Sequence, residues 1–136
     1  MSLVLDCSVT MSWCFEDEAS ELGDRILDAL QNQEAFVPSI WPLEVANVLV
    51  IAERRNRLKT ADSARFLELV RSLPILIEEV SLPRATGAVL SLAREQDLSV
   101  YDAAYLDLAM RSGATLATTD KALAKAAGRV GVGRFE

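Results

Sequence analysis

Four acidic residues stand where short apolar segments end or where helical segments begin: Asp6, Glu44, Asp102 and Asp120. A carboxylate in an apolar setting needs a proton, a hydrogen-bond partner or a metal ion. If the fold gathers these four, their charges repel one another, and a hard cation such as Mg²⁺ or Mn²⁺ relieves the repulsion because it prefers carboxylate oxygens. The chemistry expected of such a site is metal-activated attack of water on a phosphodiester.

The composition removes several other kinds of chemistry. The chain has no histidine, which excludes Ser-His-Asp triads and histidine metal ligands. Its two cysteines, Cys7 and Cys14, are too few for a zinc site or a disulfide framework, and we interpret them as small buried apolar residues. The formal net charge of −6 gives the surface as a whole no attraction for nucleic acid, so binding of RNA requires a local site or a bridging cation.

Two of the acids have structural interpretations at strand ends. Asp6 ends the apolar segment LVLD, where an N-cap or an Asx turn is common. Asp120 follows LATT, so Thr118 or Thr119 could cap the next helix and place Asp120 in its first turn. For either acid alone, these structural roles compete with a catalytic one.

The other two acids stand in the first turns of predicted helices. Glu44 and Asn47 are the only polar residues between positions 43 and 52, and their spacing puts them on one face. An acid near a helix N-terminus gains from the helix dipole, but a helix this apolar must be largely buried. Ser99 and Asp102 form S-x-x-D, which resembles a capping box.

Alternating apolar runs and amphipathic stretches predict an α/β fold for the whole chain, 1–136, as a single domain. We predict strands at 2–5, 35–38, 74–77 and 114–118, leave 129–132 open as a fifth, and predict helices at 18–32, 41–57, 61–72, 83–96, 100–112 and 120–127. Strands that are apolar on both faces and alternate with helices imply a parallel sheet of four to five strands covered on both sides. Ligands of such sheets bind beyond the carboxyl ends of the strands, which is where the four acids fall.

Other features receive mainly structural interpretations. A buried stripe is predicted on the helix at 100–112: Tyr101, Ala104, Tyr105, Leu108 and Ala109. Asp107 is expected to pair with Arg111 four residues later. The basic run at 53–59 is interpreted as a solvated helix end, with RNA contact as the alternative. The acidic run at 16–18 is expected to open a helix, and Trp13 and Trp41 are expected to pack in the core rather than stack on bases.

Three segments together resemble a known family. VLDCSVTMSWCFEDE resembles the opening of PIN-domain ribonucleases, PSIWPLEVANVL their second acidic motif, and SVYDAAYLDLAMRSGATLATTDKAL their third and fourth motifs. The order and spacing match over nearly the whole chain. The similarity points in particular to the VapC-like toxins of type II toxin–antitoxin pairs, and it implies a PIN-like α/β/α fold.

The resemblance also implies a Mg²⁺-dependent endoribonuclease, with Mn²⁺ as a substitute. The family's acidic residues match Asp6, Glu44, Asp102 and Asp120. Asp6 and Asp102 correspond to direct metal ligands, while Glu44 and Asp120 complete the pocket partly through water. Ser8 and Thr118 match supporting hydroxyl positions. The implied partners are an RNA substrate, a VapB-like antitoxin and a second copy in a homodimer.

Three rival functions are weaker. An aspartyl-nucleophile phosphatase carries a second acid two residues after the first, where this chain has Ser8. A phospho-receiver domain needs an acidic pair and a later lysine, and neither pattern is convincing here. A catalytically silent binding module is disfavoured because no expected acid is missing. Without a signal peptide or an apolar run near the ~20 residues of a membrane span, we expect no membrane association and a cytoplasmic location.

Overall fold

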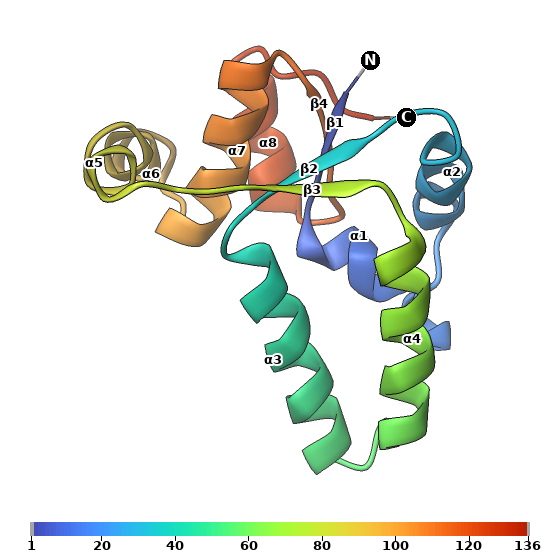
Figure 1. Cartoon of the computed structure of the whole chain (residues 1–136). Coiled ribbons are helices and arrows are strands. Elements are labelled where there is room, and N and C mark those ends of the chain that lie inside the picture. The colour runs from blue at the N-terminus through green and yellow to red at the C-terminus, as the bar shows by residue number, and fades with distance from the viewer. Residues whose placement is uncertain (1, 136) are drawn as a thin grey trace.

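A four-stranded parallel sheet forms the centre of the protein (Figure 1), as seen in a computed structural model that describes residues 2–135. The strands are β1 (Leu3–Leu5), β2 (Ala35–Pro38), β3 (Ile75–Glu78) and β4 (Thr115–Ala117). Their order is β3-β2-β1-β4, and every pair is parallel. The predicted parallel sheet is therefore confirmed, with four strands.

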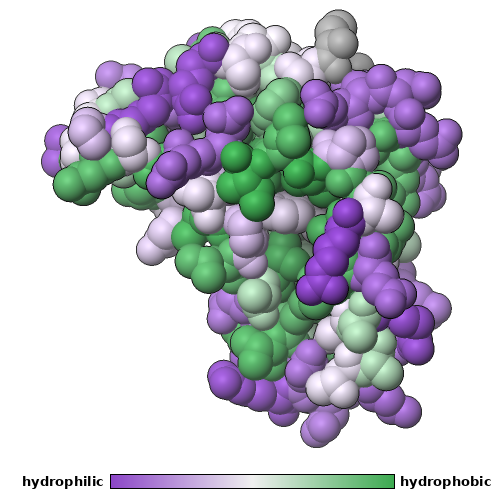
Figure 2. All heavy atoms as spheres, viewed as in Figure 1, coloured by the Kyte–Doolittle hydropathy of each residue, from purple (hydrophilic) through white to green (hydrophobic). Residues whose placement is uncertain are grey.

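The central strand β1 is apolar on both of its faces. All three residues of β1 are fully buried. The edge strand β3 differs, since Leu76 is 42% exposed and Ile77 is 56% exposed. In Figure 2 green, hydrophobic spheres accordingly gather over β3 and continue over the upper part of α3.

Helices surround the sheet and reach beyond it. They are α1 (Cys7–Ser12), the 3₁₀-helix η1 (Glu16–Glu18), α2 (Glu21–Ala29), α3 (Trp41–Arg54), α4 (Thr60–Ser72), α5 (Leu82–Arg84), the π-helix η2 (Ala85–Val89), α6 (Leu90–Gln96), α7 (Val100–Ser112) and α8 (Lys121–Arg129). α7 packs on β1 and β2, whereas α3 and α4 extend away from the sheet as a hairpin (Figure 1). Within residues 2–135, no helix has both the length and the apolar character needed to cross a bilayer.

Several element boundaries differ from the sequence prediction. The helix α1 was not among the predicted elements, and the predicted helix at 83–96 is divided into α5, the π-helix η2 and α6. No strand forms at 129–132, because α8 continues to Arg129 and Gly131 then turns the chain with a φ of 78°. A single parallel bridge between Leu116 and Arg134 joins this end to β4.

A buried ion pair fixes α5 against α7. Asp107, only 6% exposed, accepts two bonds from Arg84, at 2.7 Å from Nε and 2.8 Å from Nη2, and one from Arg111 at 3.2 Å. Burial acts to raise the pKa of Asp107, but the two arginines outweigh it and hold that pKa below its usual range. The predicted pair with Arg111 is confirmed. The stronger partner, Arg84, is 23 residues away in sequence.

Replacing Asp107 by Asn is expected to lower the free energy of unfolding by about 2 kcal/mol at neutral pH, as measured by urea denaturation. This is less than the cost of breaking a fully buried pair, because the Arg84 and Arg111 side chains remain 37% and 31% exposed. Since folding lowers the pKa of Asp107, the wild type should lose this advantage as the pH falls through that pKa. The exposed Asp28→Asn serves as the control, and equal stability of the two variants would contradict the expectation.

Candidate active site

Asp6 lies at the carboxyl end of β1 and is 6% exposed. Its carboxylate does not cap α1, although Asp6 occupies the N-cap position. Oδ2 instead accepts hydrogen bonds from the hydroxyls of Ser8 and Thr118, both at 2.7 Å. The capping interpretation of Asp6 is therefore wrong, and the structure places both predicted supporting hydroxyls on this carboxylate.

Backbone groups orient the two hydroxyls. The Ser8 Oγ accepts the Thr119 N–H at 3.2 Å, and the Thr118 Oγ1 accepts the Asp120 N–H at 3.0 Å. Each hydroxyl thus uses a lone pair on the backbone and directs its proton at Asp6. The loop after β4 is in this way tied to the loop after β1, and the Asp6 carboxylate is held in one orientation.

Glu44 is half-buried in the first turn of α3 and is held from α7. The Tyr105 hydroxyl, on a fully buried side chain, donates a hydrogen bond to the Glu44 Oε1. Burial raises the pKa of Glu44; the bond from Tyr105 lowers it, and the nearby charges of Asp6 and Asp102 raise it again, with a net upward shift. Helical spacing predicted only a place on the buried stripe for Tyr105, although a buried tyrosine hydroxyl usually needs a polar partner.

Asp102 lies in the first turn of α7, and its side chain is partly buried. Ser99 caps the helix by accepting the Asp102 N–H at 3.1 Å, but the reciprocal bond of a capping box is not formed. Burial, then the charges of Asp6 and Asp120, raise the pKa of Asp102 above the usual range, which the weaker effect of Ser99 does not offset. The S-x-x-D pattern therefore supplies a cap through Ser99 alone.

Asp120 is itself the N-cap of α8. Its Oδ1 accepts the Leu123 N–H at 2.9 Å, so neither Thr118 nor Thr119 has the capping role that the sequence suggested. The side chain is exposed, and its charge contributes to the raised pKa values of Asp6 and Asp102. Burial raises the pKa of Asp6 more than the charge of Asp120 does. Asp120 thus combines a structural bond with a place beside the other acids.

The structure brings the four acids together at the carboxyl edge of the sheet. Each of Asp6, Glu44 and Asp102 has a raised pKa caused first by burial and then in part by the charge of another member. Within residues 2–135, however, no three acidic or cysteine side chains already converge closely enough to hold a metal ion by themselves. A magnesium ion fits this donor set, because it takes one or two carboxylates directly and keeps several waters.

The remaining candidates lie elsewhere. Arg57, from the basic run, binds Asp17 and Glu18 at 2.9 Å each and lies 4.1 Å over the ring of Phe15. The acidic run forms only the short 3₁₀-helix η1. Arg57 thus joins the basic run to the acidic run through ion pairs, a contact that was not predicted from the sequence.

Both tryptophans pack inside the protein, as predicted. Trp41 is 6% exposed, and its Nε1 donates to the Thr10 Oγ1 at 3.0 Å. Trp13 is partly buried and donates to the Gly23 carbonyl at 2.9 Å. Tyr101 departs from the predicted buried stripe, because its side chain is 59% exposed at the start of α7.

Comparison with known proteins identifies the fold family. The PIN-domain family model matches residues 3–129. The chain is 31% identical over 125 residues to Ribonuclease VapC3 of Pyrobaculum aerophilum, covering 92% of this chain and 94% of that protein. The range 3–129 spans the positions of all four acids and both hydroxyls.

Two crystal structures share the architecture. PAE2754 from Pyrobaculum aerophilum has a TM-score of 0.70 and 24% identity, covering 93% of this chain and 79% of that one. VapBC2 from Rickettsia felis, bound to a DNA fragment from its promoter, has a TM-score of 0.69 and 17% identity, covering 100% and 98%. The four-stranded parallel sheet, the helices around it and the family match agree: this chain belongs to the PIN-domain family.

Proposed function

We propose that this chain is a Mg²⁺-dependent endoribonuclease and the toxin of a toxin–antitoxin pair. The observation that carries the proposal is the buried Asp6 carboxylate, held by two hydroxyls beside Glu44, Asp102 and Asp120. The similarity to Ribonuclease VapC3 supports RNA as the substrate. A silent binding module would have no need for three carboxyl groups whose pKa values burial and mutual repulsion raise.

Asp6 and Asp102 are the proposed direct ligands of Mg²⁺ or Mn²⁺. Within residues 2–135 both side-chain hydrogen bonds to Asp6 end on Oδ2, so its other oxygen receives none from a side chain, and no basic side chain pairs with Asp102. Glu44 and Asp120 are proposed to act through water. When bound, the cation supplies an activated water and stabilises the charge that develops on the phosphodiester.

The supporting residues orient these carboxylates. Ser8 and Thr118 hold Asp6 in place, and Tyr105 holds Glu44 toward the site from α7. Asp120 is fixed by its bond to the Leu123 N–H, which leaves its second oxygen for a bound water. Asp6, Glu44 and Asp120 therefore enter the site from different parts of the fold with little freedom to rotate.

We also propose a VapB-like antitoxin as the protein partner, a homodimer as the assembled form and the cytoplasm as the location. The resemblance of the acidic motifs to VapC-like toxins and the similarity to Ribonuclease VapC3 support the antitoxin. Light scattering of the purified chain tests the dimer. Co-purification with the product of a neighbouring short reading frame tests the antitoxin.

Purified protein is expected to cleave single-stranded RNA with Mg²⁺ or Mn²⁺ and to lose this activity in EDTA, with recovery when the metal is restored. The physical reason is that the acids alone repel a phosphodiester, so the negatively charged substrate needs a cation between them. Gel analysis of labelled RNA fragments measures the cleavage.

The same reaction separates the nuclease from the phosphatase alternative. Mass spectrometry of protein quenched during turnover is expected to find no phosphate on Asp6. Cleavage that continues undiminished in EDTA, or a trapped aspartyl-phosphate on Asp6, would contradict the proposal.

A further inference from the structure

An uncharged groove of about 290 Å³ opens beside the acids. Its walls come from the start of α3, the start of α7 and the helical segment at 82–96. They include Ile40, Leu43, Val80, Val89, Val100 and Tyr101. No charged side chain lines the groove, unlike the carboxylate site next to it.

The groove and the acids share two helix first turns. Leu43 lines the groove and directly precedes Glu44; Tyr101 lines it and directly precedes Asp102. One turn of α3 and one turn of α7 therefore present an apolar side chain to the groove and a carboxylate to the site. A group in the groove therefore lies against the same helix turns that carry Glu44 and Asp102.

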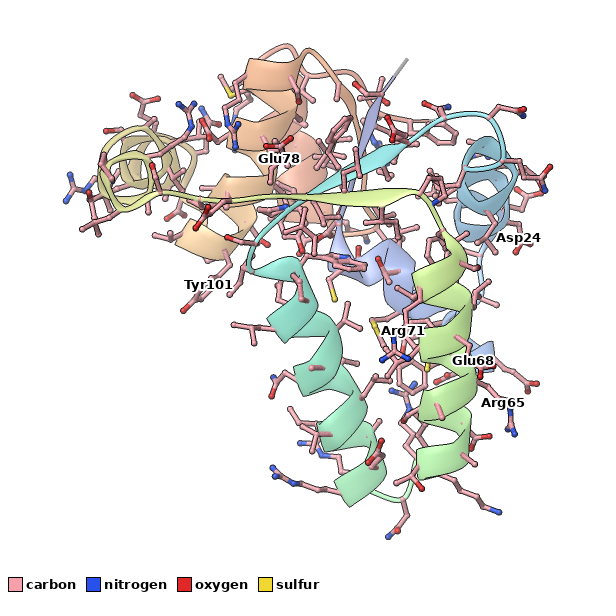
Figure 3. The ribbon with its side chains drawn as sticks, in the orientation of Figure 1. Asp24, Arg65, Glu68, Arg71, Glu78 and Tyr101 are labelled. Atoms are coloured by element: carbon pink, nitrogen blue, oxygen red, sulfur yellow. The ribbon has the colours of Figure 1, made fainter. Side chains whose placement is uncertain are left out.

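Tyr101 has the exposure expected of a stacking surface rather than a core residue. Its side chain is 59% exposed, whereas Tyr105, one helical turn later, is fully buried. In Figure 3 Tyr101 extends outward from the beginning of α7, clear of the sheet and on the side toward α3. Leu43, across the groove, is 67% exposed.

One polar group gives the groove a hydrogen-bonding edge. Ser39 lines it, and its Oγ accepts the Val80 N–H at 3.2 Å. Within residues 2–135 the Ser39 hydroxyl proton has no acceptor, so it is available to a ring nitrogen or a carbonyl oxygen. The groove therefore offers an aromatic face, an apolar wall and one donor, which suit a flat, uncharged heterocycle.

Charge also favours a base as the occupant. The chain carries a net charge of −6, and the acids repel RNA phosphates. Beyond the proposed cation, affinity for RNA near the site therefore depends on the bases, which stack on aromatic side chains without needing positive charge. We propose that this groove holds one unpaired base of the RNA, stacked on Tyr101, beside the phosphodiester that is cleaved; this rests on the proposed function.

The experiment compares wild type with Tyr101→Ala and Tyr101→Phe on a short single-stranded RNA of mixed sequence. Tyr101→Ala is expected to raise KM about tenfold with a smaller change in kcat, and to weaken the base preference next to the cleavage site. Tyr101→Phe retains the ring and is expected to stay near wild type. Met110→Ala is the matched control, since Met110 is 46% exposed on the same helix and does not line the groove.

An abasic nucleotide at the preferred position makes the test specific. The KM of wild type should rise about tenfold on the abasic RNA. The KM of Tyr101→Ala should rise no further on it, because the missing base and the missing ring remove the same contact. An unchanged KM for Tyr101→Ala, or an equal defect in Tyr101→Phe, would overturn the proposal. A change of oligomeric state in Tyr101→Ala, seen by light scattering, would instead make the groove a protein interface and also overturn it.

Binding measurements separate this inference from the proposed function. Fluorescence anisotropy of a labelled single-stranded RNA reports binding whether or not the RNA is cut. RNA that wild type binds but does not cleave would contradict the nuclease, and a roughly tenfold weaker Kd for Tyr101→Ala would still support the base site. Absence of both binding and cleavage by wild type would overturn both proposals.

Discussion

Replacing Asp6 by Asn is expected to reduce RNA cleavage by at least about a thousandfold and to leave the fold intact. A unit charge facing a cation at about 4 Å contributes ~4 kcal/mol at an effective dielectric of 20, and ~4 kcal/mol corresponds to about three powers of ten in rate. The amide oxygen of Asn can still accept the bonds from Ser8 and Thr118. Only the charge and one ligand oxygen are lost.

Cleavage rates at saturating Mg²⁺ measure this effect, and circular dichroism verifies the fold. Asp28→Asn removes the same charge from an exposed position on α2 and should cleave like wild type. A folded Asp6→Asn protein with full activity would show that this carboxylate is not part of the site. The same substitution at Asp102 should give a loss of similar size, because the two are the proposed direct ligands.

The sheet was predictable because its strands are local apolar runs. The segments at 2–5, 35–38, 74–77 and 114–118 each match a strand of the structure to within one or two residues at either end. The π-helix η2 was not predictable, since no residue type within 85–89 distinguishes it from an α-helix. The strand at 129–132, left open from the sequence, does not form: apolar Val130 and Val132 suited a strand, but α8 runs to Arg129 and the chain turns at Gly131.

The acids of the site were predictable from their positions at strand ends and helix starts, but most of their partners were not. Tyr105 contacts Glu44 across 61 residues, and Thr118 contacts Asp6 across 112. Periodicity describes which face of a helix is apolar and says nothing of such distant pairs. Only the family resemblance pointed to Thr118. Tyr101 was misassigned because helical spacing placed it on the buried stripe, whereas α7 begins at the rim of the sheet.

In the absence of metal, Asp102→Asn is expected to melt no lower than wild type and to melt higher at neutral pH. Folding raises the pKa of Asp102, so the folded state holds its proton more tightly than the unfolded state. That contribution to stability is full below the ordinary pKa of 3.8 and is lost as the pH rises through the folded pKa. Asn carries no charge, so the variant should show a flatter dependence of melting temperature on pH above 3.8.

Mg²⁺ should reverse the order of the two melting temperatures, so that wild type melts higher than Asp102→Asn. Binding to the folded state alone stabilises it by ~2.7 kcal/mol at one hundred times the dissociation constant. Wild type should gain this amount, while Asp102→Asn, with one direct ligand fewer, should gain clearly less. Thermal melts with and without Mg²⁺ measure both shifts, and Asp28→Asn should follow wild type. Equal shifts in wild type and Asp102→Asn would mean that Asp102 serves only the first turn of α7, where Ser99 already provides the cap.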